Sequence, residues 1–168
     1  MSRTIRQATI NDIPDILSVF EDAKQKMRDI GNTEQWSDGY PSTSVVASDI
    51  ERKGGFVIED RKTIIAYFAF IPAPEPTYAQ IYGGQWIDDE QPYYVIHRLA
   101  SRKGTSGVFA TMMNYCQSKT CNIRIDTHRR NSVMKYNIGK FGFKYCGIIH
   151  LANGDERLAF QRIITRLD

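Results

Sequence analysis

The sequence predicts an α/β fold of the mixed α+β kind, in which helices flank a central sheet of mixed strand direction. Three observations lead to this prediction. Strand-like and helix-like patterns alternate along the chain, a strand, a glycine-bearing turn and a helix follow one another at residues 95–116, and the chain closes on two strands around a turn at 153–155. With 168 residues, 42% of them hydrophobic, we expect a single globular domain spanning 1–168.

A strand and two helices are expected first. Residues 4–8 alternate weakly, as in a short strand, and an apolar stripe over 13–23 with charges on the opposite side indicates an amphipathic helix. Gly31 is a suitable end for that helix, because glycine readily adopts the left-handed conformation that often follows a helix. Ser42 or Thr43 is expected to cap a shorter second helix.

A hairpin and a long excursion are expected next. The runs 56–59 and 63–71 are typical of two strands joined by a charged turn. Three prolines then interrupt the pattern over 72–92, with 78–82 as a further predicted strand. Because an excursion of this length inside a compact domain is often a lid or a binding loop, we expect a functional role for it. The closing antiparallel hairpin is expected within 144–165.

The most informative local feature is a basic, glycine-bearing turn that precedes a helix beginning near Val108. Its sequence is Arg102-Lys103-Gly104-Thr105-Ser106-Gly107. Unpaired backbone N–H groups at the positive end of a helix dipole form a cradle that favours a phosphate group. A solvated basic pair is the alternative for Arg102 and Lys103, but their place at a helix start favours phosphate contact.

Composition narrows the classes of partner and the cellular setting. The net charge of +3 is small and dispersed, which argues against nucleic acid and suits an enzyme with a local anion site. The three cysteines contain no CxxC pair, so buried, reduced thiols in the cytoplasm are expected. The chain has no apolar run long enough for a bilayer, which predicts no membrane partner. The three histidines are dispersed, so we expect no metal site.

A second group of residues follows the turn in a recognisable order: Arg124-Ile125-Asp126-Thr127-His128, Asn131, Met134 and Lys140-Phe141-Gly142-Phe143. Together with the element order, these motifs resemble the GNAT (GCN5-related) N-acetyltransferases over nearly the whole chain. Four further groups resemble a bacterial subgroup of unassigned acceptor: Gln35-Trp36, Tyr40-Pro41, His97-Arg98-Leu99 and Cys146-Gly147-Ile148-Ile149. The family's acetyl-CoA signature is Gln/Arg-x-x-Gly-x-Gly/Ala. Arg102 and Gly107 occupy its first and last positions, while Thr105 replaces the middle glycine.

The resemblance implies a mostly antiparallel sheet of about six to seven strands with about four helices, whose fourth and fifth strands splay apart around acetyl-CoA. It further implies that the pantetheine pairs with the fourth strand, that the diphosphate lies on the amides of the turn, and that a residue of the following helix meets the cofactor arm. The cofactor-binding residues expected on this basis are Leu99, Ala100, Arg102, Lys103, Gly104, Thr105, Ser106, Gly107, Val108 and Asn131.

Candidate catalytic residues are His97 and two tyrosines. His97 suits a general base at neutral pH, although a structural histidine is an equally good interpretation. Because Arg98 is its neighbour on a strand, the two are expected on opposite sides of the sheet. The resemblance places a proton-donating tyrosine where this chain has Ile138, so Tyr136 or Tyr145 is expected to take its place.

Five further residues are candidates for acceptor binding. Trp36, Tyr40 and Trp86 either wall the acceptor pocket or act as aromatic lids of the core. Asp126 either orients an amine or caps the next helix. His128 either contacts the adenosine 3′-phosphate, with its neighbouring arginines, or is simply exposed.

These observations favour acyl transfer from acetyl-CoA to a primary amine by direct attack in a ternary complex. The acceptor is expected to be a small molecule, an amino acid derivative or a peptide. A non-catalytic acyl-CoA-binding or interaction module is the alternative, because of Thr105 and the missing tyrosine. A nucleotide-binding domain is less well supported, since the turn lacks the P-loop and dinucleotide fingerprints. The sequence leaves a monomer and a homodimer equally open.

Overall fold

The computed structural model describes residues 3–37 and 39–166 of the chain. These residues form seven strands, four α-helices and two short 3-10 helices: β1 (Arg3–Gln7), η1 (Ile10–Asp12), α1 (Ile13–Asp29), α2 (Thr43–Glu51), β2 (Gly55–Asp60), β3 (Thr63–Pro72), η2 (Pro76–Tyr78), β4 (Tyr94–Ser101), α3 (Val108–Lys119), β5 (Asn122–Thr127), α4 (Ser132–Lys140), β6 (Lys144–His150) and β7 (Glu156–Ile163). The predicted fold class, strand number and helix number are confirmed.

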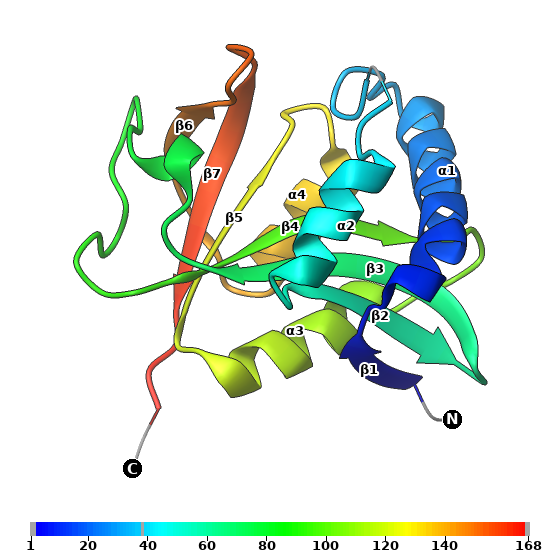
Figure 1. Ribbon diagram of the computed structural model, residues 1–168. Helices are drawn as coiled ribbons and strands as arrows, with labels where there is room; N and C mark the ends of the chain where they lie inside the picture. Colours follow the sequence, from blue (N-terminus) through cyan, green and yellow to red (C-terminus); the bar gives the residue numbers. More distant parts are fainter. Residues whose placement is uncertain (1–2, 38, 167–168) are drawn as a thin grey trace.

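One seven-stranded sheet organises the molecule, in the order β1-β2-β3-β4-β5-β7-β6 (Figure 1). All neighbouring pairs are antiparallel except β4 and β5, which run parallel. Only Tyr94–Ile96 of β4 pair with β5, at Ile123–Ile125, and after these residues the two strands diverge. The predicted splay between the fourth and fifth strands is therefore present, and it opens the sheet beside the start of α3.

Helices cover the two faces of the sheet in pairs. On β2, Phe56 packs in one core cluster with α3, while its neighbour Val57 packs in another with α1 and α2. Because successive strand residues point to opposite faces, α1 with α2 and α3 with α4 lie on opposite sides of the sheet. The helix starts follow the sequence signals: Ser42 accepts the Val45 N–H at the start of α2, and Asn131 accepts the Met134 N–H at the start of α4.

The excursion between β3 and β4, residues 73–93, covers the part of the sheet that α1 and α2 leave open. Its Tyr78 and Trp86 pack with Val95 of β4 and with β6 and β7 in a third apolar cluster. In Figure 1 this segment (green) lies beside β6 and β7, away from α1. The predicted strand at 78–82 is wrong: the segment contains η2 and a single bridge between Tyr82 and Ile148.

The cysteines depart in part from the sequence-based expectation. All three are free thiols within the described part of the chain, and Cys116 and Cys146 are buried as predicted. Cys121 is exposed, because it lies in the short turn between α3 and β5, where no core side chain covers it.

We predict that Gly84→Ala loosens the excursion from the sheet. A Cβ at Gly84 would lie 2.0 Å from the Cys146 carbonyl oxygen, a backbone atom that cannot move aside cheaply. We expect a loss of about 2–3 kcal/mol in the free energy of unfolding, measured by chemical denaturation. Gly139→Ala is the control, because nothing lies within 4 Å of its Cβ and alanine should stabilise helix α4 by about 0.5–1 kcal/mol. Equal stability of the two variants would contradict this prediction.

Candidate active site

The site is organised by an irregularity in β4. Pairing with β3 passes from Ala69 opposite His97 to Tyr67 opposite Ala100, so Arg98 and Leu99 together oppose a single residue. Arg98 has a φ of 56°, in the left-handed region that a non-glycine residue seldom occupies. These are the features of a β-bulge, which leaves one residue outside the ladder and redirects side chains.

The bulge changes where two predicted residues lie. His97 and Arg98 were expected on opposite sides of the sheet, but both line the same cavity. The expectation is wrong because strict alternation requires regular extended backbone, and the positive φ of Arg98 breaks it. The cavity, here called the β4 cavity, has a volume of about 610 Å³ and lies between α2, the loop after α1, η2 and the β6–β7 turn.

A second cavity lies where β4 and β5 separate. This α3 cleft has a volume of about 630 Å³ and is bordered by the second half of α1, the end of β4, the turn before α3, and α4. Met27, Leu99 and Met134 line both the α3 cleft and the β4 cavity. The two cavities therefore adjoin at the bulge, with apolar side chains around the junction.

The start of α3 faces the α3 cleft and is suited to an anion. Gly107 occupies the N-cap position with a left-handed φ of 72°, and no side chain among the described residues caps it. The first N–H groups of the helix thus point into the cleft at the positive end of the helix dipole. Lys26 also lines the cleft, where its ammonium donates to Ser101 Oγ at 2.6 Å. Burial lowers the pKa of Lys26.

Two carboxylates flank His97 in the β4 cavity. His97 Nε2 lies 3.2 Å from Glu75 Oε2, and Nδ1 lies 3.9 Å from Asp126 Oδ2. Burial alone would raise the pKa of Glu75, but hydrogen bonds from His97 and Thr77 lower it to about 2. Because an ionised carboxylate only accepts hydrogen bonds, Glu75 favours the proton on Nε2 and leaves the Nδ1 lone pair available.

Asp126 is held by a buried tyrosine. The Tyr78 hydroxyl donates to Asp126 Oδ2 at 2.6 Å, and burial together with the Asp126 charge raises the pKa of Tyr78 well above its ordinary value. Tyr78 is therefore a permanent donor, which fixes the Asp126 carboxylate beside the imidazole.

A buried ion pair holds the bulge itself. Asp49 of α2 is only 2% exposed and accepts from Arg98 Nε at 2.9 Å and from Arg98 Nη2 at 2.5 Å. The Tyr67 hydroxyl donates to the same carboxylate at 2.6 Å, and Arg98 Nη1 donates to the Tyr40 hydroxyl. Burial alone would lower the pKa of Arg98, but Asp49 and Tyr40 raise it, so the guanidinium stays charged.

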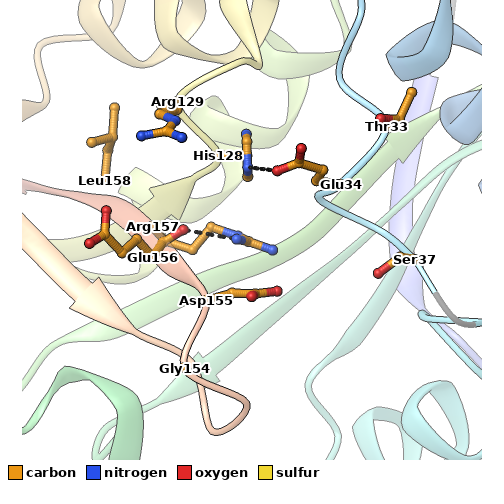
Figure 2. A pocket seen from close by; sticks show the side chains of 10 residues that line it. All are labelled: Thr33, Glu34, Ser37, His128, Arg129, Gly154, Asp155, Glu156, Arg157 and Leu158. Carbon is orange, nitrogen blue, oxygen red and sulfur yellow. Dashed lines mark hydrogen bonds and ion pairs between the residues drawn. The ribbon is translucent and has the colours of Figure 1, made fainter.

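A third cavity of about 510 Å³ adjoins the β4 cavity at Arg157 and is drawn in Figure 2. There His128 Nδ1 accepts the Arg130 N–H, and Nε2 faces Glu34 Oε2 at 3.5 Å. Figure 2 shows His128 turned toward Glu34 and Arg157 reaching into the space between them and Asp155. Burial, then the nearby Arg157 charge, lowers the pKa of His128.

Comparison with known proteins identifies this architecture. The sequence matches none of the protein-family models and none of the curated proteins with which it was compared. In contrast, the fold is similar to a GNAT-family acetyltransferase from Streptococcus agalactiae, with a TM-score of 0.87 and 30% identity over 98% of this chain and 96% of that one. The chain belongs to the GNAT family of acetyltransferases.

More distant structures share the fold of this GNAT enzyme. A putative acetyltransferase from Staphylococcus aureus has a TM-score of 0.72 at 22% identity, covering 96% of this chain and 99% of that one. A ribosomal-protein-alanine N-acetyltransferase from Brucella melitensis has a TM-score of 0.63 at 17% identity, covering 96% and 99%. These two structures show the shared fold; the 30% identical structure shows that the protein is an N-acetyltransferase of the GNAT family, and its acceptor stays unassigned.

Seven of the predicted cofactor-binding residues line the α3 cleft of this GNAT enzyme: Leu99, Ala100, Thr105, Ser106, Gly107, Val108 and Asn131. Arg102, Lys103 and Gly104 are outside its lining. The Arg102 guanidinium donates to the Ile64 carbonyl and to Ser18 Oγ, and the Lys103 N–H donates to Asp22, so this turn is tied to β3 and α1.

The predicted acceptor and catalytic residues divide into two groups. His97, Trp36, Tyr40 and Asp126 come together in the β4 cavity, while His128 lies in the adjoining third cavity. The other three lie outside these cavities. Tyr136 and Tyr145 are 68% and 54% exposed, and Trp86 is a core residue in the third apolar cluster.

Several residues of the site are not among those predicted from the sequence. Glu75 precedes η2 in a proline-rich loop, and no sequence pattern indicates that this loop returns to His97. Asp49 occupies the buried face of α2, where a lone acidic residue among apolar positions was the available signal. Among the described residues no cluster of potential metal ligands occurs, and none of the helices is both long and apolar enough to cross a membrane.

We predict that Asp49→Asn is strongly destabilising. The substitution leaves the buried Arg98 guanidinium without its counter-charge, which should cost about 3–5 kcal/mol of unfolding free energy in a denaturation experiment. Asp60→Asn, which breaks a looser pair with Arg3 at 3.6 Å, is the control and should cost less than about 1 kcal/mol. Similar losses of unfolding free energy in both variants would show that Asp49 contributes no more to stability than the partly exposed Asp60.

We predict a pH-dependent effect for Glu75→Gln. Because the folded-state pKa of Glu75 is about 2, below the model-peptide value of 4.5, its carboxylate stabilises the fold above about pH 4.5, and this contribution disappears as pH falls toward 2. At pH 7 the unfolding free energy of the wild type should exceed that of the variant by about 1–2 kcal/mol. This difference, measured from denaturation curves, should become smaller by pH 3. The exposed Glu21→Gln is the control. A gap that is constant with pH would contradict the prediction.

Proposed function

We propose that this enzyme transfers an acetyl group from acetyl-CoA in the α3 cleft to a primary amine in the β4 cavity. The junction of the two cavities at Met27, Leu99 and Met134 is the observation that carries the proposal. One cavity presents a helix N-terminus suited to a diphosphate, and the other presents an imidazole between two carboxylates suited to an ammonium group. Two substrates of these kinds would meet at the bulge.

The α3 cleft suits CoA on both charge and shape. The diphosphate would lie on the uncapped N–H groups that begin at Gly107, where a Cβ would approach only the Arg3 guanidinium, at 3.6 Å. The pantetheine would lie along β4 near Leu99 and Ala100, whose strand edge is free of β5 at this point. Thr105 does not disturb the cradle, because Gly104 and Gly107 take the left-handed positions and Thr105 Oγ1 donates to the Arg102 carbonyl.

The β4 cavity would bind the amine and remove its proton. An ammonium group entering between Glu75 and Asp126 would be attracted to both carboxylates, and His97 Nδ1 would accept a proton from it. The neutral nitrogen would then attack the thioester carbonyl carbon. As the N–C bond forms and the C–S bond breaks, backbone N–H groups freed by the bulge near Leu99 would stabilise the oxyanion.

The departing group requires no tyrosine in this scheme. A thiol pKa of about 8.5 makes the CoA thiolate a tolerable leaving group, and the proton held on His97 can return to the sulfur. His97 would then accept the remaining extra proton of the acylated nitrogen and release it to water. This accounts for an enzyme in which buried Ile138 occupies the family's usual tyrosine position, and in which Tyr136 and Tyr145 are exposed to solvent. The acceptor would be a small molecule, an amino acid derivative or a peptide with a free amine.

The test is an acetylation assay with acetyl-CoA and a panel of amines, followed by release of free thiol. We predict that His97→Gln lowers kcat by about 10²–10⁴-fold, because it removes the base, while the Kd for CoA measured by calorimetry stays within about twofold. His150→Gln is the control, since His150 lies on β6 outside both cavities. Absence of CoA binding in the wild type, or full activity of His97→Gln, would overturn the proposal.

A further inference from the structure

A buried arginine lies behind the active site and is unaccounted for by the proposed chemistry. Arg124 of β5 is 1% exposed, and its guanidinium carbon lies 4.0 Å from the Trp86 ring centroid and 3.9 Å from that of Tyr93. Its Nη2 donates to the Asp88 carbonyl at 3.0 Å and to Asp89 Oδ1 at 2.9 Å. Within residues 3–37 and 39–166, Nε has no hydrogen-bond partner.

Each of the two rings is hydrogen-bonded to a residue near His97, Tyr93 to Glu75 and Trp86 to Tyr78. On one side, the Tyr93 hydroxyl accepts the Glu75 N–H at 3.0 Å, and Glu75 Oε2 lies 3.2 Å from His97 Nε2. On the other side, Trp86 Nε1 donates to the Tyr78 carbonyl at 3.1 Å. The guanidinium is thus one ring contact and one hydrogen bond away from Glu75 and from Tyr78.

The Tyr78 hydroxyl completes the second path by donating to Asp126 Oδ2 at 2.6 Å. Arg124 and Asp126 are two residues apart on β5, so both point to the same face and hold the same excursion. The excursion, residues 73–93, has no regular strand pairing to the sheet, so its position depends on side-chain contacts such as these.

We infer that Arg124 is a positioning residue. It orients Tyr93 and Trp86 so that Glu75 contacts His97 and Tyr78 contacts Asp126. The inference rests on the proposed function, in which His97 is the base and Glu75 sets its tautomer. An apolar side chain could fill the same volume, but it would lack the two N–H bonds to residues 88 and 89 and the cation–π attraction that draws both rings against one plane.

The neighbouring strand supports this role. Gln161 of β7 is the cross-strand partner of Arg124, and its Nε2 donates to the same Asp88 carbonyl at 3.0 Å. Its Oε1 accepts the Ile87 N–H at 2.8 Å. Two side chains from adjacent strands therefore fix residues 87–89 of the excursion. The positions of Trp86 and Tyr93, which lie on either side of these residues, depend on this attachment.

The experiment compares Arg124→Met, Tyr93→Phe, Glu75→Gln and the Arg124→Met/Glu75→Gln double variant in the acetylation assay. We expect kcat to fall by about 10- to 100-fold in each single variant, with the KM for acetyl-CoA within about twofold of wild type, because the α3 cleft is untouched. In the double variant, the loss of kcat should be smaller than the product of the two single losses, because the path through Tyr93 acts on Glu75. Arg162→Met is the matched control, since Arg162 of β7 contacts Gln117 of α3 instead of the excursion.

Amide hydrogen exchange gives a readout independent of turnover. The Glu75 N–H should exchange faster in Arg124→Met and in Tyr93→Phe, and at the wild-type rate in Arg162→Met. Should Arg124→Met fail to fold, Tyr93→Phe still decides, because it keeps the ring stack and removes only the hydroxyl that accepts the Glu75 N–H. A multiplicative loss of kcat in the double variant, or unchanged kcat in folded Tyr93→Phe, overturns the inference.

The outcomes also separate this inference from the proposed function. If His97→Gln and Glu75→Gln keep wild-type kcat, the proposed base is wrong and the role of Arg124 falls with it. If both lose activity while Arg124→Met and Tyr93→Phe keep it, the proposed function stands and only the positioning role is overturned.

Discussion

The ion pair between Arg98 and Asp49 is the constraint on which the rest of this structure depends. Arg98 adopts a conformation that is unfavourable for a side chain, and the two hydrogen bonds to a buried carboxylate on α2 compensate for it. The bulge that results breaks the alternation of β4. Both cavities then meet at Leu99, and His97 enters the same cavity as Arg98.

The site is assembled from parts with different structural origins. The anion-binding side of the α3 cleft is local: β4, a turn with two left-handed glycines and the uncapped start of α3 follow one another over residues 94–119. The β4 cavity is non-local, because α2 holds Arg98 while the excursion supplies Glu75 and Tyr78. If the α3 cleft binds the cofactor and the β4 cavity the acceptor, as proposed, the acceptor side can change through its loops while the cofactor side is kept.

This difference explains how much the sequence could predict. The element order and the mixed sheet follow from local patterns of apolar residues, glycines and caps. The seven residues of the α3 cleft come from the glycine-bearing turn and from the family resemblance. His97, Trp36, Tyr40 and Asp126, for each of which the sequence left a structural alternative open, line one cavity. Glu75 could not be found this way, because its distance to His97 depends on how a proline-rich loop packs. For Trp86 the sequence is compatible both with a pocket wall and with a lid of the core. In the structure its ring packs in the core against Arg124.

The docking of the excursion against β6 also bears on how the molecule avoids self-association. β6 is an edge strand, and an open edge is a template for strand addition by another chain. Tyr82 and Ile148 exchange N–H···O bonds at that edge, and Gly84 and Gly147 let the two backbones approach closely. One segment thus supplies Glu75 to the active site and shields an edge of the sheet. Its detachment would expose an unpaired sheet edge at the same time as it removed the carboxylate beside His97, so under the proposed function edge protection and catalysis would depend on the same segment.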